Sequence, residues 1–388
     1  MIAILYQALP PPSIDGLRKD AKPGGYSDGG ADIAFALRLA GWAIVTPVDD
    51  PDPAVALDWV FPDTDAGIAA ARMAGADTLW ANTVLFEEHP LASVLGEVAV
   101  IGQHPAAMQA FDDKFATNRL LAEAGLPVAR SFLLSATSRE GGRDRVWALG
   151  DLDDALDASG LRFPLIVKPV RGRGSQGVTR VADRAALQVA AGDLIRRATF
   201  GDMLMVEEYL DGEELTVTVM PPASPRPDGS RGGLHPALRH WALRPVRRFA
   251  QRGGVAPYNG DVPVTANSDA IEGSRLTEPA VAAMTDACVA AAALVDARAA
   301  IRIDCREDRD GVFRLFDLNM KPNMTGPGRP GRDDQDCLSA IAARAEGWRY
   351  VDLLQAMARA RWSDDPVRSD RLSRDTDRHG GRSPSSDI

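Results

Sequence analysis

The chain has 388 residues, of which 45% are hydrophobic and 25% are charged, and its net charge at pH 7 is −10. This length allows two or three domains with sizeable cores. The acidic charge argues against nucleic acid or an anionic membrane surface as a partner, because both carry the same sign of charge. No apolar run reaches the length of a membrane span, and the N-terminus lacks the features of a signal peptide. The three cysteines have neither metal-binding nor disulfide-framework spacing, so we expect reduced thiols in a cytoplasmic protein.

The first hundred residues or so alternate between strand and helix patterns. Residues 2–7 and 77–83 are apolar runs typical of buried strands, and 98–103 is another. Residues 29–49 predict a helix, a glycine stop and a strand, and 54–64 predict a strand before a helix at 65–75. Such alternation predicts a parallel α/β sheet. We therefore expect an N-terminal α/β domain at residues 1–105.

The remaining chain mixes helices with strand pairs, so the expected class is α/β (α+β). We expect a central domain at 106–200, a C-terminal domain at 201–362 and a disordered tail at 363–388, because the tail has almost no apolar residues. Residues 203–221 predict two strands around a turn, and 299–320 predict two more strands. Residues 234–268 predict an irregular, basic stretch.

A glycine-rich loop at 172–177 follows an apolar strand at 161–169. Its GxGxxG pattern is also found in dinucleotide-binding folds, where the third glycine begins a helix. Here Val178, Thr179 and Val181 follow the third glycine and favour a strand. No acidic residue for a ribose stands at the end of a second strand, which disfavours an NAD-dependent oxidoreductase. The loop is better explained as a β-hairpin that covers phosphates, although a plain glycine-rich turn has the same pattern.

Several polar side chains have the chemistry of a nucleotide site. Lys168 ends an otherwise apolar strand, where an unpaired charge is costly, and Lys114 is a second candidate cation for phosphate oxygens. Each could also be a surface lysine, and Glu207 and Glu214 could be one face of a charged hairpin. Two carboxylates and one amide oxygen are suited to Mg²⁺, and the candidates are Asp304, Asp317 and Asn319.

Five motifs in order resemble the ATP-grasp superfamily, and within it the D-alanine–D-alanine ligases and related carboxylate–amine ligases. They are "DKFATNRLLAEAGLPVA", "FPLIVKPVRGRGSQGV", "VEEYLDGEELTV", "RIDC" and "FDLNMKPNMTGPG". The resemblance implies an ATP-grasp fold preceded by the N-terminal α/β domain, with ATP and Mg²⁺ (or Mn²⁺) as cofactors. By position it implies phosphate contacts from Lys114 and Lys168, and Arg302 as the catalytic residue that stabilises the tetrahedral intermediate. The remaining implied ligands are Gly172, Gly174, Ser175 and Gly177 over the phosphates, Glu207 and Leu210 at adenine, Glu214 at ribose, and Asp304, Asp317 and Asn319 at the metal.

The resemblance implies an ADP-forming ligase that joins a carboxylate to an amine through an acyl phosphate. Departures from the family concern the substrate side: a glycine-loop serine, a glutamate for the first amino group and a serine for the second carboxylate have no counterpart. Arg329, Arg332 and Asn323 are candidate substitutes. We therefore expect amino-acid ligation in dipeptide or specialised-metabolite synthesis, such as that of mycosporine-like compounds.

Alternatives are a D-alanine–D-alanine ligase proper and an ATP-sensing module without chemistry. Small-molecule acids and amines are the expected partners, together with a homodimer. The five arginines of 239–255 predict a lid over anions, and a solvated loop is the alternative reading.

Overall fold

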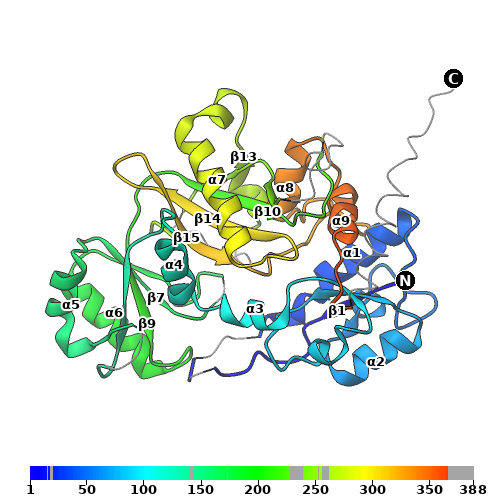
Figure 1. Ribbon diagram of the computed structural model, residues 1–388, viewed down its shortest axis with the longest axis horizontal. Helices are drawn as coiled ribbons and strands as arrows, with labels where there is room; N and C mark the ends of the chain where they lie inside the picture. The colour runs from blue at the N-terminus through cyan, green and yellow to red at the C-terminus, as the bar shows by residue number, and fades with distance from the viewer. Residues whose placement is uncertain are drawn as a thin grey trace.

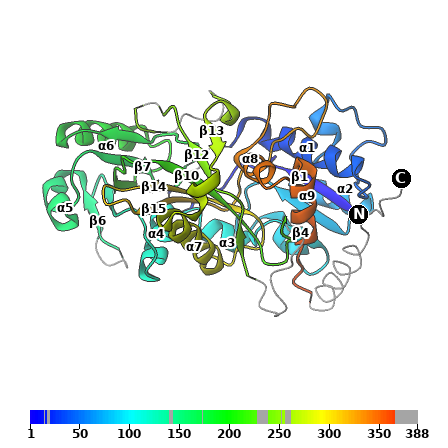
Figure 2. The same ribbon diagram turned by 90° about the horizontal axis from the view of Figure 1, so that it is seen from above.

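The computed structural model describes residues 1–365 except 15, 18–20, 140–143, 173, 228–238, 252 and 256–261. Three sheets lie in a row along the long axis of the molecule, as Figures 1 and 2 show. The N-terminus is at the side of the N-terminal sheet (Figure 2). Most of the predicted tail lies outside the described residues. Trp362, just before the tail, forms an antiparallel bridge with Val100, and Ser363, the first residue of the predicted tail, is buried.

The N-terminal sheet is parallel throughout, which confirms the α/β prediction for this part of the chain. Its order is β2-β1-β3-β4, and helices α1 and α2 pack on it. One predicted strand is wrong: of residues 42–49 only Ile44 forms a bridge, to Ile2. The elements are β1 (Ile2–Tyr6), α1 (Ser27–Leu39), β2 (Phe61–Pro62), α2 (Asp65–Met73), β3 (Thr78–Asn82) and β4 (Ala99–Ile101).

The central sheet has the order β6-β5-β9-β7-β8, and α5 and α6 supply side chains to its core. Because β9 pairs with both β5 and β7, this sheet continues past residue 200, where we expected the domain to end. The turn that follows β9 is a better boundary between the central and C-terminal domains. The elements are β5 (Ser131–Ser135), β6 (Val146–Ala148), α5 (Leu152–Ser159), β7 (Leu165–Pro169), β8 (Thr179–Val181), α6 (Arg184–Arg197) and β9 (Leu204–Glu208).

The C-terminal sheet is antiparallel along β13-β12-β10-β14-β15, and β11 also pairs with β10. Strands β9 and β10 therefore belong to different sheets, although the sequence suggested one hairpin. The irregular stretch predicted at 234–268 is wrong in part, because Trp241 and Val246 are buried in strands that pair with β10. The strands are β10 (Glu214–Met220), β11 (Trp241–Ala242), β12 (Val246–Arg248), β13 (Ser268–Ala270), β14 (Ile301–Glu307) and β15 (Phe313–Asn319).

The remaining helices connect and close the sheets. They are α3 (Pro105–Ala110), α4 (Lys114–Glu123), α7 (Pro279–Leu294), α8 (Leu338–Ala345) and α9 (Tyr350–Arg359). The short 3₁₀ turns are η1 (Pro23–Tyr26), η2 (Ala56–Asp58), η3 (Pro90–Val94), η4 (Leu149–Asp151), η5 (Val264–Ala266) and η6 (Gly273–Thr277). Figure 1 shows α7 in front of β10, β14 and β15, with α4 below them. None of the helices in the described part of the chain has the length and apolarity of a membrane span.

The segment after β1 links the N-terminal sheet to the central sheet. In Figure 1 it runs as a dark-blue trace along the lower edge of the molecule, toward the green strands. Leu17 is 2% exposed and belongs to a small apolar cluster with Leu133, Val146, Val170 and Met205 of the central unit. The backbone of Gly201 lies so close to Gly16 and Leu17 that a side chain there would overlap them. Leu17 therefore anchors this segment in the central unit.

Candidate functional site

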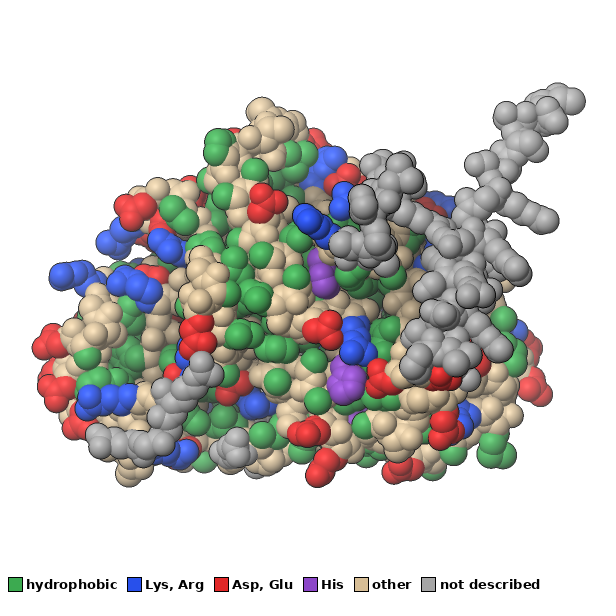
Figure 3. All heavy atoms as spheres, in the orientation of Figure 1, with side chains coloured by type: hydrophobic (Ala, Val, Ile, Leu, Met, Phe, Trp, Pro, Cys, Tyr) green, Lys and Arg blue, Asp and Glu red, His purple; other side chains and the backbone are tan. Residues whose placement is uncertain are grey.

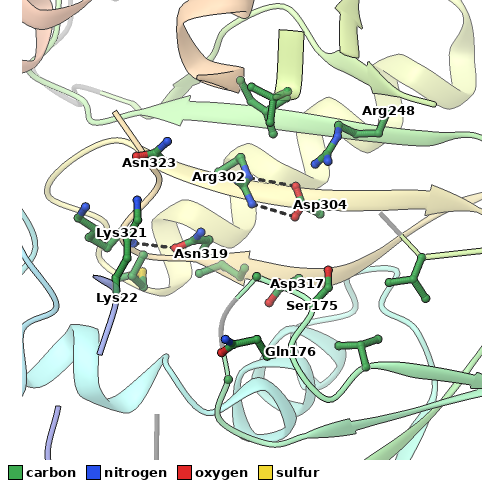
Figure 4. Close-up of a pocket in the computed structure, with 18 of the residues that line it drawn as sticks. Lys22, Ser175, Gln176, Arg248, Arg302, Asp304, Asp317, Asn319, Lys321 and Asn323 are labelled. Carbon is green, nitrogen blue, oxygen red and sulfur yellow. Dashed lines mark hydrogen bonds and ion pairs between the residues drawn. The ribbon is translucent and has the colours of Figure 1, made fainter. Parts of the chain in front are cut away.

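The main cleft of the described structure has a volume of about 520 Å³ and lies between the central and C-terminal sheets. Most of the residues singled out from the sequence line it, and Figure 4 shows several of them. Two do not: Gly177, in the turn before β8, and Arg329. The lining set comprises Lys114, Lys168, Gly172, Gly174, Ser175, Glu207, Leu210, Glu214, Arg302, Asp304, Asp317, Asn319, Asn323 and Arg332.

Lys168 on β7 and Glu207 on β9 form a buried ion pair in the central sheet. The Lys168 Nζ donates to Glu207 Oε1 at 2.8 Å and to the carbonyl of Phe316 at 3.2 Å. Both side chains are at most 5% exposed. Burial raises the pKa of Glu207, although Lys168 opposes that shift. The cation thus stands at the end of an apolar strand because a carboxylate on the neighbouring strand compensates its charge.

Lys114 and Asp317 connect the start of α4 to β15. The Lys114 Nζ donates to Asp317 Oδ1 at 2.6 Å. Burial would raise the pKa of Asp317, but the cations Lys114, Lys168 and Arg302 outweigh it and hold that pKa below its ordinary value. Asp113 begins the helix by accepting from the backbone N–H of Ala116, so Lys114 sits in its first turn.

Asp304 on β14 lies directly opposite Asp317 on β15 in the strand register. The predicted convergence of the two carboxylates is therefore confirmed as a backbone arrangement. Asp304 Oδ1 accepts from Thr216 Oγ1 at 2.7 Å, and Arg302 donates to both carboxylate oxygens at 3.2 Å. Burial lowers the pKa of Arg302, but Asp304 has the larger combined effect and the pKa is raised, which keeps the guanidinium charged.

The donor set at this end of β14 and β15 fits a hard divalent cation. Asp304 and Asp317 supply carboxylate oxygens, and Asn319, two residues along β15, supplies an amide oxygen. Within the described residues no three His, Cys, Asp or Glu side chains gather into a metal-binding group. Two carboxylates with one amide suit an ion that takes its other ligands from phosphate oxygens, so the residues fit Mg²⁺ or Mn²⁺.

The glycine loop connects two antiparallel strands, β7 and β8, and does not begin a helix. This finding confirms the hairpin prediction and removes the structural basis for a dinucleotide-binding fold. Ser175, Gly174 and Gly177 have positive φ values of 64°, 58° and 71°. A Cβ on Gly177 would come within 2.8 Å of the Pro169 ring, so the loop requires glycine there. The hairpin places its tip over Asp317 and Asn319, where Figure 4 shows Ser175 and Gln176.

The chain passes from the central to the C-terminal sheet through Leu210, and Arg306 on β14 holds this connection. Arg306 donates to the carbonyls of Leu210 at 3.2 Å and Gly254 at 2.8 Å, and it pairs with Glu214. Burial raises the pKa of Glu214, which also accepts from Gln251 at 2.6 Å. Sequence reasoning missed Arg306; an arginine between strand-forming residues, two positions after Asp304, was the available signal.

Comparisons with known proteins agree with this geometry. The family described as "D-ala D-ala ligase C-terminus" matches residues 120–227. A D-alanine–D-alanine ligase A of Mesorhizobium japonicum is 28% identical over 69% of this chain and 66% of its own length. A D-alanine–D-alanine ligase of Bifidobacterium adolescentis is 26% identical over 66% of this chain and 64% of its own length. The matches thus span slightly less than two thirds of these relatives.

Solved structures extend the likeness over nearly the whole chain. The D-alanine–D-alanine ligase of Bacillus anthracis complexed with ATP has a TM-score of 0.59, with 17% identity over 96% of this chain and 98% of that one. The VanG D-Ala:D-Ser ligase of Enterococcus faecalis has a TM-score of 0.56, with 14% identity over 92% and 98%. The chain has the fold of these ligases and is similar in sequence to D-alanine–D-alanine ligases. The fold class expected from the sequence is thereby confirmed.

One residue expected to bind the substrate, Arg329, does not line the cleft. Arg329 is 5% exposed and is turned away from the cleft, with hydrogen bonds to Asp32 at 2.9 Å, Asp28 at 3.1 Å and the carbonyl of Pro53 at 3.1 Å. The carboxylate of Asp32 on α1 is buried and requires a cationic partner. Arg329 supplies that cation, which explains why it does not line the cleft as expected. Arg332 also pairs with Asp32, at 2.8 Å, but its side chain is 20% exposed and lines the cleft. Arg332 stays a candidate substrate ligand.

The basic segment 239–255 is not a separate lid over its described length. Its β11 and β12 pair with β10, so residues 241–248 belong to the C-terminal sheet. Arg248 lines the cleft (Figure 4), where burial lowers its pKa despite nearby Asp304 and Glu214. Arg247 instead pairs with Asp269 near the surface, and Arg252 lies outside the described residues. On the face in Figure 3, acidic and basic side chains are interspersed.

Sequence reasoning also missed two lysines at the far end of the cleft, Lys22 and Lys321. Both lie over the ring of Tyr26, with Nζ 4.4 Å and 3.1 Å from its centroid. The available signal was weak: "KPGGY" before a helix and "NMKPN" after a strand place one lysine each at an element end. These lysines add cationic groups to the part of the cleft beyond Asn319.

Proposed function

We propose that this protein is an ADP-forming ligase that joins a carboxylate to an amine. One observation carries the proposal: Lys168 and Lys114 both line the cleft and each contacts a carboxylate, and the partner of Lys114 faces Asp304 across β14 and β15. Paired cations and carboxylates below a glycine hairpin match what a nucleoside triphosphate with its metal requires. The ATP-grasp fold and the related ligases support the same reaction class.

In this proposal the ATP phosphates bind to Lys114 and Lys168 under the hairpin of residues 172–177. The adenine lies beside the Glu207–Leu210 connection, and Glu214 accepts from the ribose hydroxyls. Ion pairs inside the cleft support this placement, since each cation then needs only a small reorganisation to exchange a carboxylate oxygen for a phosphate oxygen. The residues that would hold Mg²⁺ are Asp304, Asp317 and Asn319, and the ion would neutralise charge on the phosphates.

The reaction has two balanced steps. An oxygen of the substrate carboxylate forms a bond to the γ-phosphorus as the bond to the ADP oxygen breaks, which gives an acyl phosphate. The amine nitrogen then forms a bond to the acyl carbon, the C–O bond to phosphate breaks, and the nitrogen loses a proton. In this proposal Arg302 stabilises the oxyanion of the second step, and its charge, which Asp304 maintains, supports that role. Positioning and charge supply most of the catalysis.

The substrates are proposed to be small acids and amines, with an amino acid among them, in dipeptide or specialised-metabolite synthesis. D-Alanine–D-alanine ligation itself is the alternative, and the relatives' activity supports it. A cytoplasmic homodimer without nucleic-acid or membrane partners is also part of the proposal. Light scattering after size-exclusion chromatography measures the oligomeric state.

The test is a coupled assay for ADP over pairs of acids and amines with ATP and Mg²⁺. ADP and phosphate should appear only when both an acid and an amine are present. Release of AMP and pyrophosphate would contradict the acyl-phosphate route. ATP binding that is tight in every mixture, with no ADP from any pair, would instead favour an ATP-sensing module.

A further inference from the structure

Arg248 on β12 contributes a positive charge to the wall of the cleft. Its backbone pairs with β10 on one side and with β13 on the other, so two neighbouring strands fix its position. Figure 4 shows its side chain beside Asp304, and the residue lines the cleft. Arg247, the preceding residue, is exposed and pairs with Asp269 outside the cleft. Successive side chains of a strand point to opposite faces, and Arg248 is the one that faces inward.

The guanidinium of Arg248 has an unused hydrogen-bond donor. Its Nε is buried and has no hydrogen-bond partner among the residues that the structure describes. The carboxylates that attract it, Asp304 and Glu214, are each held by another arginine. Arg302 donates to both oxygens of Asp304 at 3.2 Å, and Arg306 pairs with Glu214. A buried donor without an acceptor is costly, and a bound oxyanion would remove that cost.

The strand register places Arg248 between the positions proposed for the ribose and for the metal. Glu214, the proposed ribose ligand, lies directly opposite Arg248 on β10. Asp304, a proposed metal ligand, lies opposite the second residue after Glu214 on the same strand. The phosphates of ATP connect its ribose to the metal, so they must pass Arg248. The candidate substrate residue Asn323 is on the other side of Arg302 in Figure 4, which separates the acid from this position.

We propose that Arg248 binds the phosphate chain of ATP and offsets the negative charge that ADP acquires as the γ-phosphoryl group leaves. This inference rests on the proposed ligase function and adds a catalytic residue to it. When the acyl phosphate forms, the bond between the γ-phosphorus and the oxygen that bridges it to the β-phosphorus breaks. The electron pair stays on that oxygen, which becomes part of ADP, and Arg248 transfers no proton.

A guanidinium suits this role for two reasons. Its Nε and one Nη can donate to two oxygens of the same phosphate. The β-phosphate gains negative charge only as the bond to the γ-phosphorus breaks, so a cation beside it stabilises the transition state more than it stabilises bound ATP. Loss of Arg248 should therefore lower kcat as well as the affinity for nucleotides.

The test compares two neighbouring arginines that face in opposite directions. Arg248→Met removes the charge inside the cleft and keeps an apolar stem, and Arg247→Met is the matched control outside the cleft. Arg248→Lys keeps the charge and loses the paired N–H donors. Without nucleotide, Arg248→Met should melt at or above the temperature of the wild type, because it removes a buried donor that has no partner. A residue with only a structural role would lower the melting temperature when it is removed.

Titration calorimetry with adenosine, AMP, ADP and a non-hydrolysable ATP analogue, each with Mg²⁺, measures binding without turnover. Arg248→Met should bind adenosine and AMP within about twofold of the wild type, and ADP and the ATP analogue about tenfold more weakly. Arg248→Lys should recover part of this loss. Arg247→Met should bind all four ligands as the wild type does.

The ADP assay measures the catalytic part of the role. Arg248→Met should lower kcat by about 100-fold, while the KM values for the acid and the amine change by less than about threefold. Arg248→Lys should have an intermediate kcat. Arg247→Met should keep the kcat of the wild type.

Unchanged ADP affinity and unchanged kcat in Arg248→Met would overturn the inference. A loss of affinity that is already complete with adenosine would place Arg248 at the ribose, and a rise in KM confined to the acid would place it at the acid; either result would also overturn it. Failure of the wild type to release ADP from any pair of acid and amine would contradict the ligase function and the catalytic role of Arg248. Weaker ADP binding by Arg248→Met would still support the phosphate contact in that case.

Discussion

Lys114 Nζ lies 2.6 Å from Asp317 Oδ1, although 203 residues separate them in the chain. The contact joins α4, at the entry to the central unit, to the last strand of the C-terminal sheet. It also means that Asp317, which we propose as a metal ligand, is paired with a cation of the protein itself. When a metal-bound triphosphate binds, its phosphate oxygens can pair with Lys114 and its metal with Asp317. Neither charge of the pair is then left without a partner.

Asp317→Ala is expected to lower kcat by roughly 100-fold or more, because it removes both a metal ligand and the partner of Lys114. ATP binding measured by calorimetry should weaken less than turnover does. Asp308→Ala is a matched control in the turn of the same hairpin, where Asp308 pairs with Arg314 outside the cleft. If both variants retained wild-type kcat, Asp317 would have no part in the chemistry.

Asp317 should also give the protein an acid-sensitive share of its stability. The pKa of Asp317 is lower in the folded state than the ordinary 3.8. Between these two pKa values the unfolded chain therefore binds more protons than the folded protein. This stability is therefore present above pH 3.8 and is lost as pH falls through the folded value. Urea unfolding between pH 6 and pH 3 should show a shallower loss for Asp317→Asn than for the wild type. Parallel curves would contradict the depressed pKa.

Arg306→Ala is expected to raise the KM for ATP by about tenfold, since it releases two backbone carbonyls beside the adenine position and leaves Glu214 without its ion pair. Arg306→Lys keeps the positive charge but loses the several N–H donors of the guanidinium group, so it should recover only part of the affinity for ATP. Arg314→Ala, directly across the strand pair, controls for the loss of an arginine from this sheet. An unchanged KM in Arg306→Ala would separate this residue from the nucleotide.

The glycine hairpin offers a comparison within one loop. Gly177→Ala should impair ATP binding and turnover, because φ is +71° and the new Cβ would meet the Pro169 ring at 2.8 Å. Gly172→Ala should be tolerated, since the nearest atom to its Cβ is 3.7 Å away. Both variants are measured for ADP release and melting temperature. Equal effects at the two positions would mean that the hairpin backbone can accommodate a Cβ at Gly177, against this prediction.

Arg329→Ala and Arg332→Ala should separate stability from substrate binding. Loss of Arg329 should lower the free energy of unfolding by about 3 kcal/mol, because Asp32 is fully buried and keeps only Arg332. Loss of Arg332 should instead raise the KM for the acid or the amine far more than that for ATP. Denaturant unfolding and steady-state kinetics on both variants decide this. A KM effect confined to ATP would remove Arg332 from the substrate site.

The sequence could predict most of the residues that we propose for the nucleotide, Arg306 excepted, because each of them has a local pattern. Lys168 ends an apolar strand, and Val178 with Thr179 identifies the second strand of the hairpin. The position of Arg329 could not be predicted in this way, since its partner Asp32 lies 297 residues earlier on an apolar helix. The separation of β9 from β10 was hidden for a related reason: hydrogen bonds to distant strands, not the local turn, assign each strand to its sheet.

The packing of Leu17 in the apolar cluster of the central unit has a consequence for the order in which the nucleotide and the acid bind. A rotation of the central unit that narrowed the cleft around a nucleotide would pull on residue 17, and the short span to residue 22 would carry that displacement to Lys22. Nucleotide loading would then shape the pocket for the acid before the acid arrives. The wild type should bind the nucleotide before the acid. A Leu17→Ser variant, in which this packing is weakened, should bind the nucleotide and the acid in random order.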